Sequence, residues 1–212
     1  MIDLLRTICQ QMAPTDCTYI GPPIDDEAIL AELPTPLATL LRETNGFIAY
    51  GGGLHVRGAC HTPAWHSLRY WWRGDDALYR QFSAVRPTDI PFAEDALGDQ
   101  FLVRDGEVHR LLAEHGEVQA LSLGVTGFLS AAERDPVGFL ALEPLIEFGR
   151  RGGAMGPGEL LSVYPPFVVA ESSKGINIRA VPVGERISYL AQLARSIEDL
   201  PDGAVIRLRP TE

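Results

Sequence analysis

The sequence is poor in cysteine and has no long apolar run. Its three cysteines, Cys9, Cys17 and Cys60, are an odd number in a chain of ordinary domain size, which argues against a disulfide framework and fits a reducing compartment. No apolar segment reaches the roughly 18 residues that a membrane-spanning helix requires. The N-terminal stretch MIDLLRTICQQMAP lacks the basic start and continuous apolar run of a signal peptide. We therefore expect a cytoplasmic protein without a membrane span.

Basic side chains are outnumbered by acidic ones. The 212 residues include 18 Lys and Arg against 28 Asp and Glu, a formal net charge of −10. Such a chain is expected to repel nucleic acid and anionic membranes and to attract basic partners, although a mild acidic excess also serves solubility alone. With 46% hydrophobic residues, the chain can bury the core of one domain without disulfides or metals.

The sequence also lacks a coherent catalytic set. The run ALSLG around Ser122 weakly resembles a nucleophile elbow, but the last histidine is His115, so the order of a Ser–acid–His triad is impossible. The glycines at 51–53 are not followed by Lys-Ser/Thr, which excludes a P-loop, and Val56 stands where a dinucleotide fingerprint has its third glycine. We predict no catalytic residues and no cofactor.

Metal ligands are similarly incomplete. Cys60, His61 and His66 lie close together in the sequence, but a second Cys/His pair is missing, and His55 and His109 are remote. Structural zinc sites usually take four ligands in paired sets. We predict no metal site, and interpret these residues as surface histidines and a small buried thiol.

Hydrophobic periodicity predicts helices in the N-terminal part. We expect an amphipathic helix over residues 2–12, a short helix capped by Asp25 or Asp26, and a third whose apolar stripe is formed by Leu37, Leu40 and Leu41. The run FIAYGGGLHV at 47–56 is typical of two strands broken by glycines. In the aromatic-rich segment 65–82, Asp75 or Asp76 is expected to cap a helix.

From residue 90 the pattern alternates as in a meander of short strands, with turns at Asp105-Gly106 and His115-Gly116. Ser122 is expected to be the N-cap of a helix. The glycine-rich segment 149–158 is the best candidate boundary. Beyond it we expect a hairpin of FVVAE (167–171) and INIRAVPV (176–183), a helix over 185–200 and a last strand, AVIRLRP (204–210).

These elements predict an α+β fold. A mostly antiparallel central sheet would carry helices packed on one face, and a C-terminal β-β-α-β extension would add to it.

Two stretches carry a resemblance to a known family. The first, LPTPLATLLRETNGF (33–47), is a leucine-bearing helix that runs into an Asn-Gly pair. The second begins DIPFAEDALGDQFLVRDGE at residue 89 and ends near Asp135-Pro136. The order of these motifs resembles the SUKH superfamily, which includes fungal cell-wall-assembly regulators and bacterial immunity proteins. The motif residues are Asn45, Gly46, Pro91, Phe92, Asp95, Gly98 and Asp99.

The resemblance implies one SUKH-like domain over residues 1–212, with a family-like core at about 30–140 and a C-terminal extension at about 159–212. It implies protein binding rather than catalysis, typically neutralisation of a cognate toxin. A regulatory or scaffold protein that binds a housekeeping partner is the alternative, and a hydrolase that uses the acidic loop is a weaker one.

Candidate partner contacts come from aromatic and acidic residues. All three tryptophans lie between positions 65 and 72, and adjacent Trp71 and Trp72 cannot point the same way, so one of them is a candidate for an exposed interface anchor. The favoured interpretation is that both pack beneath neighbouring helices. The candidate contact residues are Trp71, Trp72, Asp75, Asp76, Glu94, Asp95 and Asp99. We expect Gly46 and Gly98 to adopt positive φ and Asp95 and Asp99 to accept backbone hydrogen bonds in a tight turn.

Overall fold

A computed structural model describes residues 17–201. The helix expected over 2–12 and the strand expected over 204–210 lie outside these residues. Within them, no helix is long and apolar enough to cross a membrane.

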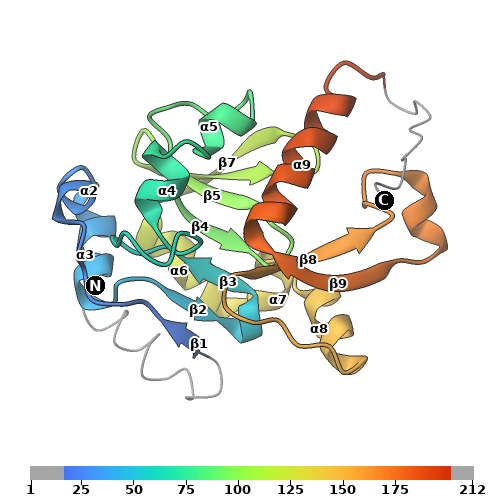
Figure 1. Cartoon of the computed structure of the whole chain (residues 1–212), viewed down its shortest axis with the longest axis horizontal. Coiled ribbons are helices and arrows are strands. Elements are labelled where there is room, and N and C mark those ends of the chain that lie inside the picture. The colour runs from blue at the N-terminus through green and yellow to red at the C-terminus, as the bar shows by residue number, and fades with distance from the viewer. Residues whose placement is uncertain (1–16, 202–212) are drawn as a thin grey trace.

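The centre of the fold is a seven-stranded antiparallel sheet in which each strand pairs with its neighbour in sequence (Figure 1). Its strands are β1 (Cys17–Ile20), β2 (Phe47–Ala49), β3 (Leu54–Val56), β4 (Ile90–Asp95), β5 (Gln100–Arg104), β6 (Glu107–Leu112) and β7 (Glu117–Leu123). The predicted turn between β5 and β6 is confirmed: Asp105 and Gly106 have φ of 53° and 87°, as a tight hairpin turn requires.

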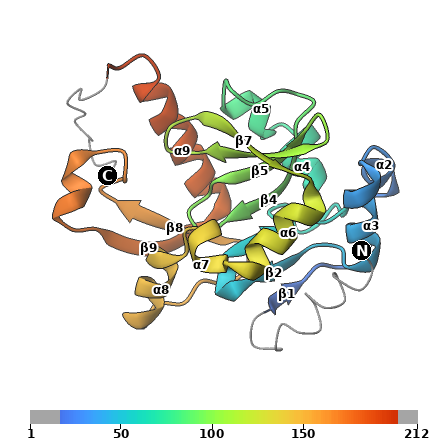
Figure 2. The ribbon, with the colours of Figure 1, turned by 180° about the vertical axis from the view of Figure 1, so that it is seen from behind.

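Helices cover both faces of this sheet. On β5, Phe101 lies in one core cluster and Leu102 in another, and adjacent strand residues point to opposite faces. The Phe101 cluster includes side chains of α2 (Glu27–Ala31), α3 (Thr35–Glu43) and α6 (Val125–Arg134). Figure 2 shows α6 and α7 (Pro136–Phe139) on this side.

The opposite face is covered by α5 (Leu78–Gln81) and the long C-terminal helix α9 (Val183–Ile197), with α4 (Leu68–Arg73) beside them (Figure 1). The predicted α+β class is therefore confirmed. The expectation of helices on one face was wrong, because α9 of the C-terminal extension and α5 pack on the second face. The apolar stripe expected on the C-terminal helix is present on α9, where Ile187, Leu190 and Ala194 are all buried against the sheet.

The rest of the extension is a separate two-stranded hairpin, β8 (Glu159–Tyr164) with β9 (Asn177–Pro182). The backbone N–H of Leu161 donates to the carbonyl of Ala96 at 2.8 Å, which attaches the hairpin to the turn after β4. The helix α8 (Glu143–Arg150) packs beside it, and the short 3-10 helices η1 (Tyr50–Gly52) and η2 (Ala170–Lys174) complete the described elements.

Three local expectations were wrong. FVVAE is not a strand: the strand ends at Tyr164, because Pro165 and Pro166 have no N–H for a ladder. Ser122 caps no helix but lies in β7 with φ of 54°, and α6 begins at Val125 with Gly124 as its N-cap. The N-cap of α5 is Ala77, without a side-chain hydrogen bond.

Candidate functional site

The two adjacent tryptophans are both buried. Trp71 is 2% exposed and Trp72 is 4% exposed, and they belong to the core clusters on opposite faces of the sheet. Their indole N–H groups donate to the carbonyls of Trp65 and Pro87 at 3.0 and 3.2 Å. The favoured interpretation that both are packed is confirmed, and the alternative of an exposed anchor is wrong, because α4 lies between two cores and each face of it contributes one ring.

The acidic candidates divide into interior and surface residues. Glu94 and Asp95 are each 1% exposed, so they cannot serve as the partner contacts that we expected, and Asp99 is half-buried. Asp75 and Asp76 are exposed in the connection between α4 and α5. Of the acidic candidates, this pair is the one that a partner reaches without rearrangement.

The family-like motif residues have structural roles. The Asn45 side chain accepts from the N–H of Ala59 at 2.7 Å and donates to the carbonyl of Pro22 at 2.8 Å, which ties three segments together. Gly46 and Gly98 have φ of 77° and 99°, and Phe92 is fully buried. Pro91 lies in β4, and its carbonyl accepts from Arg57. The positive φ expected at Gly46 and Gly98 is confirmed.

Asp95 organises the turn between β4 and β5. Its Oδ1 accepts from the backbone N–H groups of Leu97, Gly98 and Asp99 at 3.0 to 3.1 Å. Its Oδ2 lies 2.7 Å from Nη2 of Arg110, whose Nε donates to Asp99 at 2.9 Å. The other Asp99 oxygen accepts from the N–H of Ala113. Both carboxylates are thus engaged within the fold.

A second polar cluster, which the sequence did not predict, lies inside the sheet. Glu94 Oε1 is 2.8 Å from Nδ1 of His55, and Glu94 Oε2 accepts from Arg57 at 2.7 Å and from Gln100 at 3.0 Å. All four residues are at most 5% exposed. His55 and Arg57 are 39 and 37 positions from Glu94 in the sequence, so no local motif joins them, and only the β3–β4–β5 register brings the cluster together.

His66 extends this cluster toward the loop before α4. Its Nδ1 lies 2.9 Å from Nε2 of His55, and its Nε2 lies 2.9 Å from the carbonyl oxygen of Asn45. The ring is fully buried at a junction of three glycines: a Cβ on Gly21, Gly46 or Gly58 would lie 2.4 to 2.6 Å from it. The interpretation of His55 and His66 as surface residues was wrong.

Burial governs the protonation of this cluster. Burial lowers the pKa of His66 to about 4, and it also lowers the pKa of His55, although the hydrogen bond that His55 makes to Glu94 acts in the opposite direction. Burial opposes ionisation of Glu94, but the charge of Arg57 and the hydrogen bond to His55 outweigh it and lower its pKa. An ionised carboxylate in this position is consistent with its three hydrogen-bond donors.

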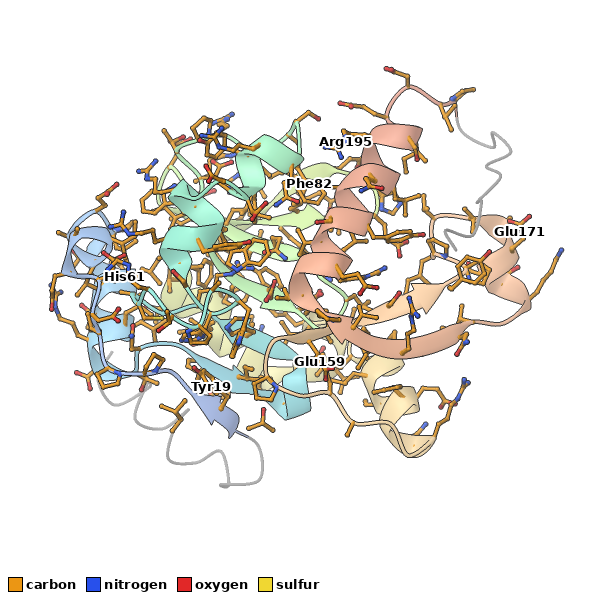
Figure 3. All side chains as sticks on the ribbon, viewed as in Figure 1. Tyr19, His61, Phe82, Glu159, Glu171 and Arg195 are labelled. Atoms are coloured by element: carbon orange, nitrogen blue, oxygen red, sulfur yellow. The ribbon has the colours of Figure 1, made fainter. Side chains whose placement is uncertain are left out.

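The cluster meets a small cleft beneath the glycine-rich segment before β8. His55 and Glu94 line it on the sheet side, and Met155, Gly156 and Glu159 line it on the other; Glu159 is labelled in Figure 3. The cleft holds about 10 Å³, roughly the space of one water molecule. A substrate of ordinary size therefore does not reach these groups in this conformation.

The other sequence-level candidates remain apart. His61 is exposed (Figure 3), and Cys60 is a buried free thiol. Among residues 17–201, no three His, Cys, Asp or Glu side chains are grouped as metal ligands. Gly51 and Gly52 have positive φ in the turn between β2 and β3, as expected of a turn.

A larger hollow of about 680 Å³ lies between α5, the β6–β7 turn and the end of α9. Phe82 and Arg195, both labelled in Figure 3, face it from the two helical regions. It also contains Glu117 and Glu198, so charges of both signs are present and no ligand charge is favoured.

Arg186 of α9 connects the C-terminal extension to two turns of the sheet. Its Nε donates to the carbonyl of Leu97 at 3.1 Å, and its Nη2 lies 3.5 Å from Oε1 of Glu114. Neither Nη atom of Arg186 nor that Glu114 oxygen has a hydrogen-bond partner. This ion pair is buried but incompletely satisfied.

No family model matches the chain, and no curated protein matches it.

Proposed function

We propose that this chain is a non-catalytic protein-binding module of the SUKH type that neutralises a cognate bacterial toxin. The proposal begins from the resemblance of residues 33–47 and 89–136 and from the net charge of −10. An acidic protein attracts a basic partner over long distances and accelerates their encounter.

The observation that carries the proposal is a contrast between interior and surface. The clustered groups with acid–base chemistry, His55, His66 and Glu94, are buried, and the cleft that His55 and Glu94 line holds only about 10 Å³. Asp75 and Asp76 are exposed. This contrast favours a function exerted at the surface over one that requires a substrate to reach the interior.

The exposed acidic pair is flanked by other side chains suited to an interface. The Tyr70 hydroxyl donates to Asp76, and Arg73 lies 3.8 Å above the ring of Trp72. Tyr and Arg are frequent among residues that dominate binding energy at protein interfaces. We therefore place the partner contact at the connection between α4 and α5.

The first experiment asks whether a partner exists. The full chain is purified together with the product of the neighbouring gene, and its expression is tested for protection of cells against that product. Stable co-purification with protection supports the proposal. Binding without any toxicity of the partner favours the regulatory or scaffold alternative, and neither binding nor protection overturns the proposal.

The second experiment asks where the partner binds. The double variant Asp75→Lys and Asp76→Lys reverses two exposed charges, and the double variant Glu133→Lys and Glu171→Lys makes the same change of charge at exposed positions elsewhere. We expect the first to weaken binding at least tenfold and to slow association, and the second to weaken it much less. Equal effects would mean that net charge alone acts and would contradict this placement.

A further inference from the structure

The hydrogen-bonded series Glu94–His55–His66–Asn45 needs one proton more than two neutral histidines and an ionised carboxylate supply. Three consecutive short contacts link the carboxylate, two imidazole rings and a backbone carbonyl, at 2.8, 2.9 and 2.9 Å. A carbonyl oxygen only accepts, so Nε2 of His66 carries a hydrogen. Because His66 is neutral, as its lowered pKa favours, its Nδ1 is an acceptor.

The hydrogens on the two His55 nitrogens follow from this assignment. If Nδ1 of His66 accepts, Nε2 of His55 must donate. The remaining His55 nitrogen, Nδ1, faces a carboxylate oxygen of Glu94. That contact needs one more hydrogen, either on Nδ1 of His55 or on Glu94. A neutral His55 beside an ionised Glu94 is one proton short, because two acceptors then face each other somewhere in the series.

We propose that this buried series is a proton-dependent latch, closed when His55 and Glu94 share one additional proton and opened at His66 when that proton leaves. Once the proton is lost, the charge-assisted bond between His55 and Glu94 is retained, because bonds to ionised groups are the stronger ones. His66 then loses either its bond to His55 or its bond to the Asn45 carbonyl. The closed series in the structure corresponds to the protonated form.

His66, at which the series opens, lies in the loop between β3 and α4. The ring of Trp65, next to His66, lies 5.0 Å from the ring of Tyr19 of β1 and 5.2 Å from that of His55, tilted against both. A Cβ on Gly158 would lie 3.0 Å from the Trp65 ring, so this ring also touches the segment before β8. Release of His66 therefore loosens the packing among β1, this loop and the glycine-rich segment.

Charged and titratable groups from every adjoining element act on the latch. Glu94 of β4 contacts His55 directly, and Arg57, just after β3, contacts the other oxygen of Glu94. Tyr19 of β1 lies 5.1 Å from the His66 ring, and Glu159 of β8 shares the cleft with His55. Arg57 disfavours a further positive charge and Glu94 favours it. Because burial lowers the pKa of His55, we expect the proton to leave below about pH 6.5, the value of an unperturbed histidine.

The test is nitrogen-15 NMR of the histidine rings in the full chain, treated with a chelator, between pH 5 and 8.5. At the acidic end we expect both nitrogens of His55 to be protonated and His66 to be the Nε2–H form with slow exchange. As the pH rises, His55 loses one proton, and the slow exchange of the His66 N–H is lost along the same titration curve.

The variant Glu94→Gln tests whether the series needs the additional proton. Its amide N–H can donate to Nδ1 of His55, so the series is complete with two neutral rings. We expect His66 to stay protected from exchange at every pH in this variant. The variant His109→Asn changes a histidine of β6 outside the latch and should titrate as the wild type does. If Glu94→Gln does not fold, the wild-type titration alone decides.

Two results would overturn the latch. One is a His55 with a single protonated nitrogen throughout the pH range while the His66 N–H remains protected. The other is that the hydrogen-bonded series forms only after one equivalent of Zn²⁺ is added, with changed nitrogen-15 shifts of both histidine rings. The cation that joins the rings would then be a metal ion and not a proton.

Discussion

The carboxylate of Asp95 and the guanidinium of Arg110 form a buried ion pair, 2.7 Å from Oδ2 to Nη2, across strands β4 and β6. The same carboxylate closes the β4–β5 turn through three backbone N–H groups. One side chain therefore fixes both a turn and the relation between two strands. The turn it fixes carries Gly98, the residue on which α9 of the extension packs.

Replacement of Asp95 should destabilise the fold strongly. We expect Asp95→Ala to lower the free energy of unfolding by about 3–5 kcal/mol, because it leaves a buried charge and three N–H groups without their acceptor. Urea unfolding measures the change. Asp105→Asn removes a carboxylate that is 87% exposed and should change stability by less than about 0.5 kcal/mol. A small effect at Asp95 would contradict its role in the turn.

Gly98 should tolerate a methyl group less well than Gly106. Both have positive φ, 99° and 87°, so alanine costs each about 1–3 kcal/mol in backbone strain. A Cβ at Gly98 would also lie 2.8 Å from Leu190 of α9, whereas nothing lies within 4 Å at Gly106. We expect Gly98→Ala to be the more destabilising by at least about 1 kcal/mol in thermal or urea unfolding. Equal losses would show that α9 adjusts freely.

The sequence predicted correctly those elements that depend on residues close together in the chain. Asp105-Gly106 specifies its hairpin turn through φ values that these residues accept, and the leucine stripe of α3 is buried as expected, with Leu37, Leu40 and Leu41 all at most 1% exposed. The start of α6 was misplaced because Ser122, a good N-cap by residue type, belongs to an irregular end of β7.

The interior polar cluster could not be predicted, because the pairing register of β3, β4 and β5 brings its residues together and the sequence does not reveal that register. His55 and Glu94 are 39 positions apart, and neither has a motif around it. Residue type alone places Glu94 on the surface, where acidic side chains usually lie. The one usable signal was its position in the run IPFAED, whose six residues are all buried in β4.

The thiol of Cys60 should be almost unreactive in the native protein. Burial, together with the charges of Asp25 and Asp26, raises its pKa to about 11, and the thiolate is the nucleophile. In a Cys9→Ser and Cys17→Ser background, we expect alkylation at pH 8 to be at least ~100-fold slower than in the same protein unfolded in urea. Comparable rates in both states would mean that the loop carrying Cys60 opens readily.

Asp26 should make stability fall in acid. Its carboxylate caps α2 through the N–H of Ile29 and pairs with Arg69, and the hydrogen bond from Arg69 is the main cause of its lowered pKa. The unfolded group titrates near ~3.9, so its contribution is present above that pH and is lost as the pH falls through the lower native value. Asp26→Asn should therefore be clearly less stable than the wild type at pH 7, and the difference should shrink toward pH 3.

The matched comparison for Asp26 is Glu27→Gln, which removes a neighbouring charge from the first turn of the same helix but no buried ion pair. We expect its effect at pH 7 to be the smaller of the two. A gap between wild type and Asp26→Asn that stays constant from pH 7 to pH 3 would contradict the linkage. Urea unfolding at each pH provides both curves.

Arg186 and Glu114 should behave as a coupled pair whose joint removal costs less than the sum of the single changes. Arg186→Met leaves a buried Glu114 carboxylate, and Glu114→Gln leaves a buried guanidinium, so each should destabilise by about 3–5 kcal/mol. The double variant removes both charges, together with the two Nη atoms of Arg186 that have no hydrogen-bond partner. We expect a coupling free energy of about 1–3 kcal/mol in a double-mutant cycle.

The exposed pair Glu147 and Arg151, 2.8 Å apart on and just after α8, provides the control cycle, with an expected coupling of about 0.3–0.5 kcal/mol. If the Arg186–Glu114 cycle gave no more than this, the pair would not be buried together in solution, and α9 would not be held to the β6–β7 turn as described. If the double variant were more stable than the wild type, the pair would serve to specify how α9 docks rather than to strengthen the docking.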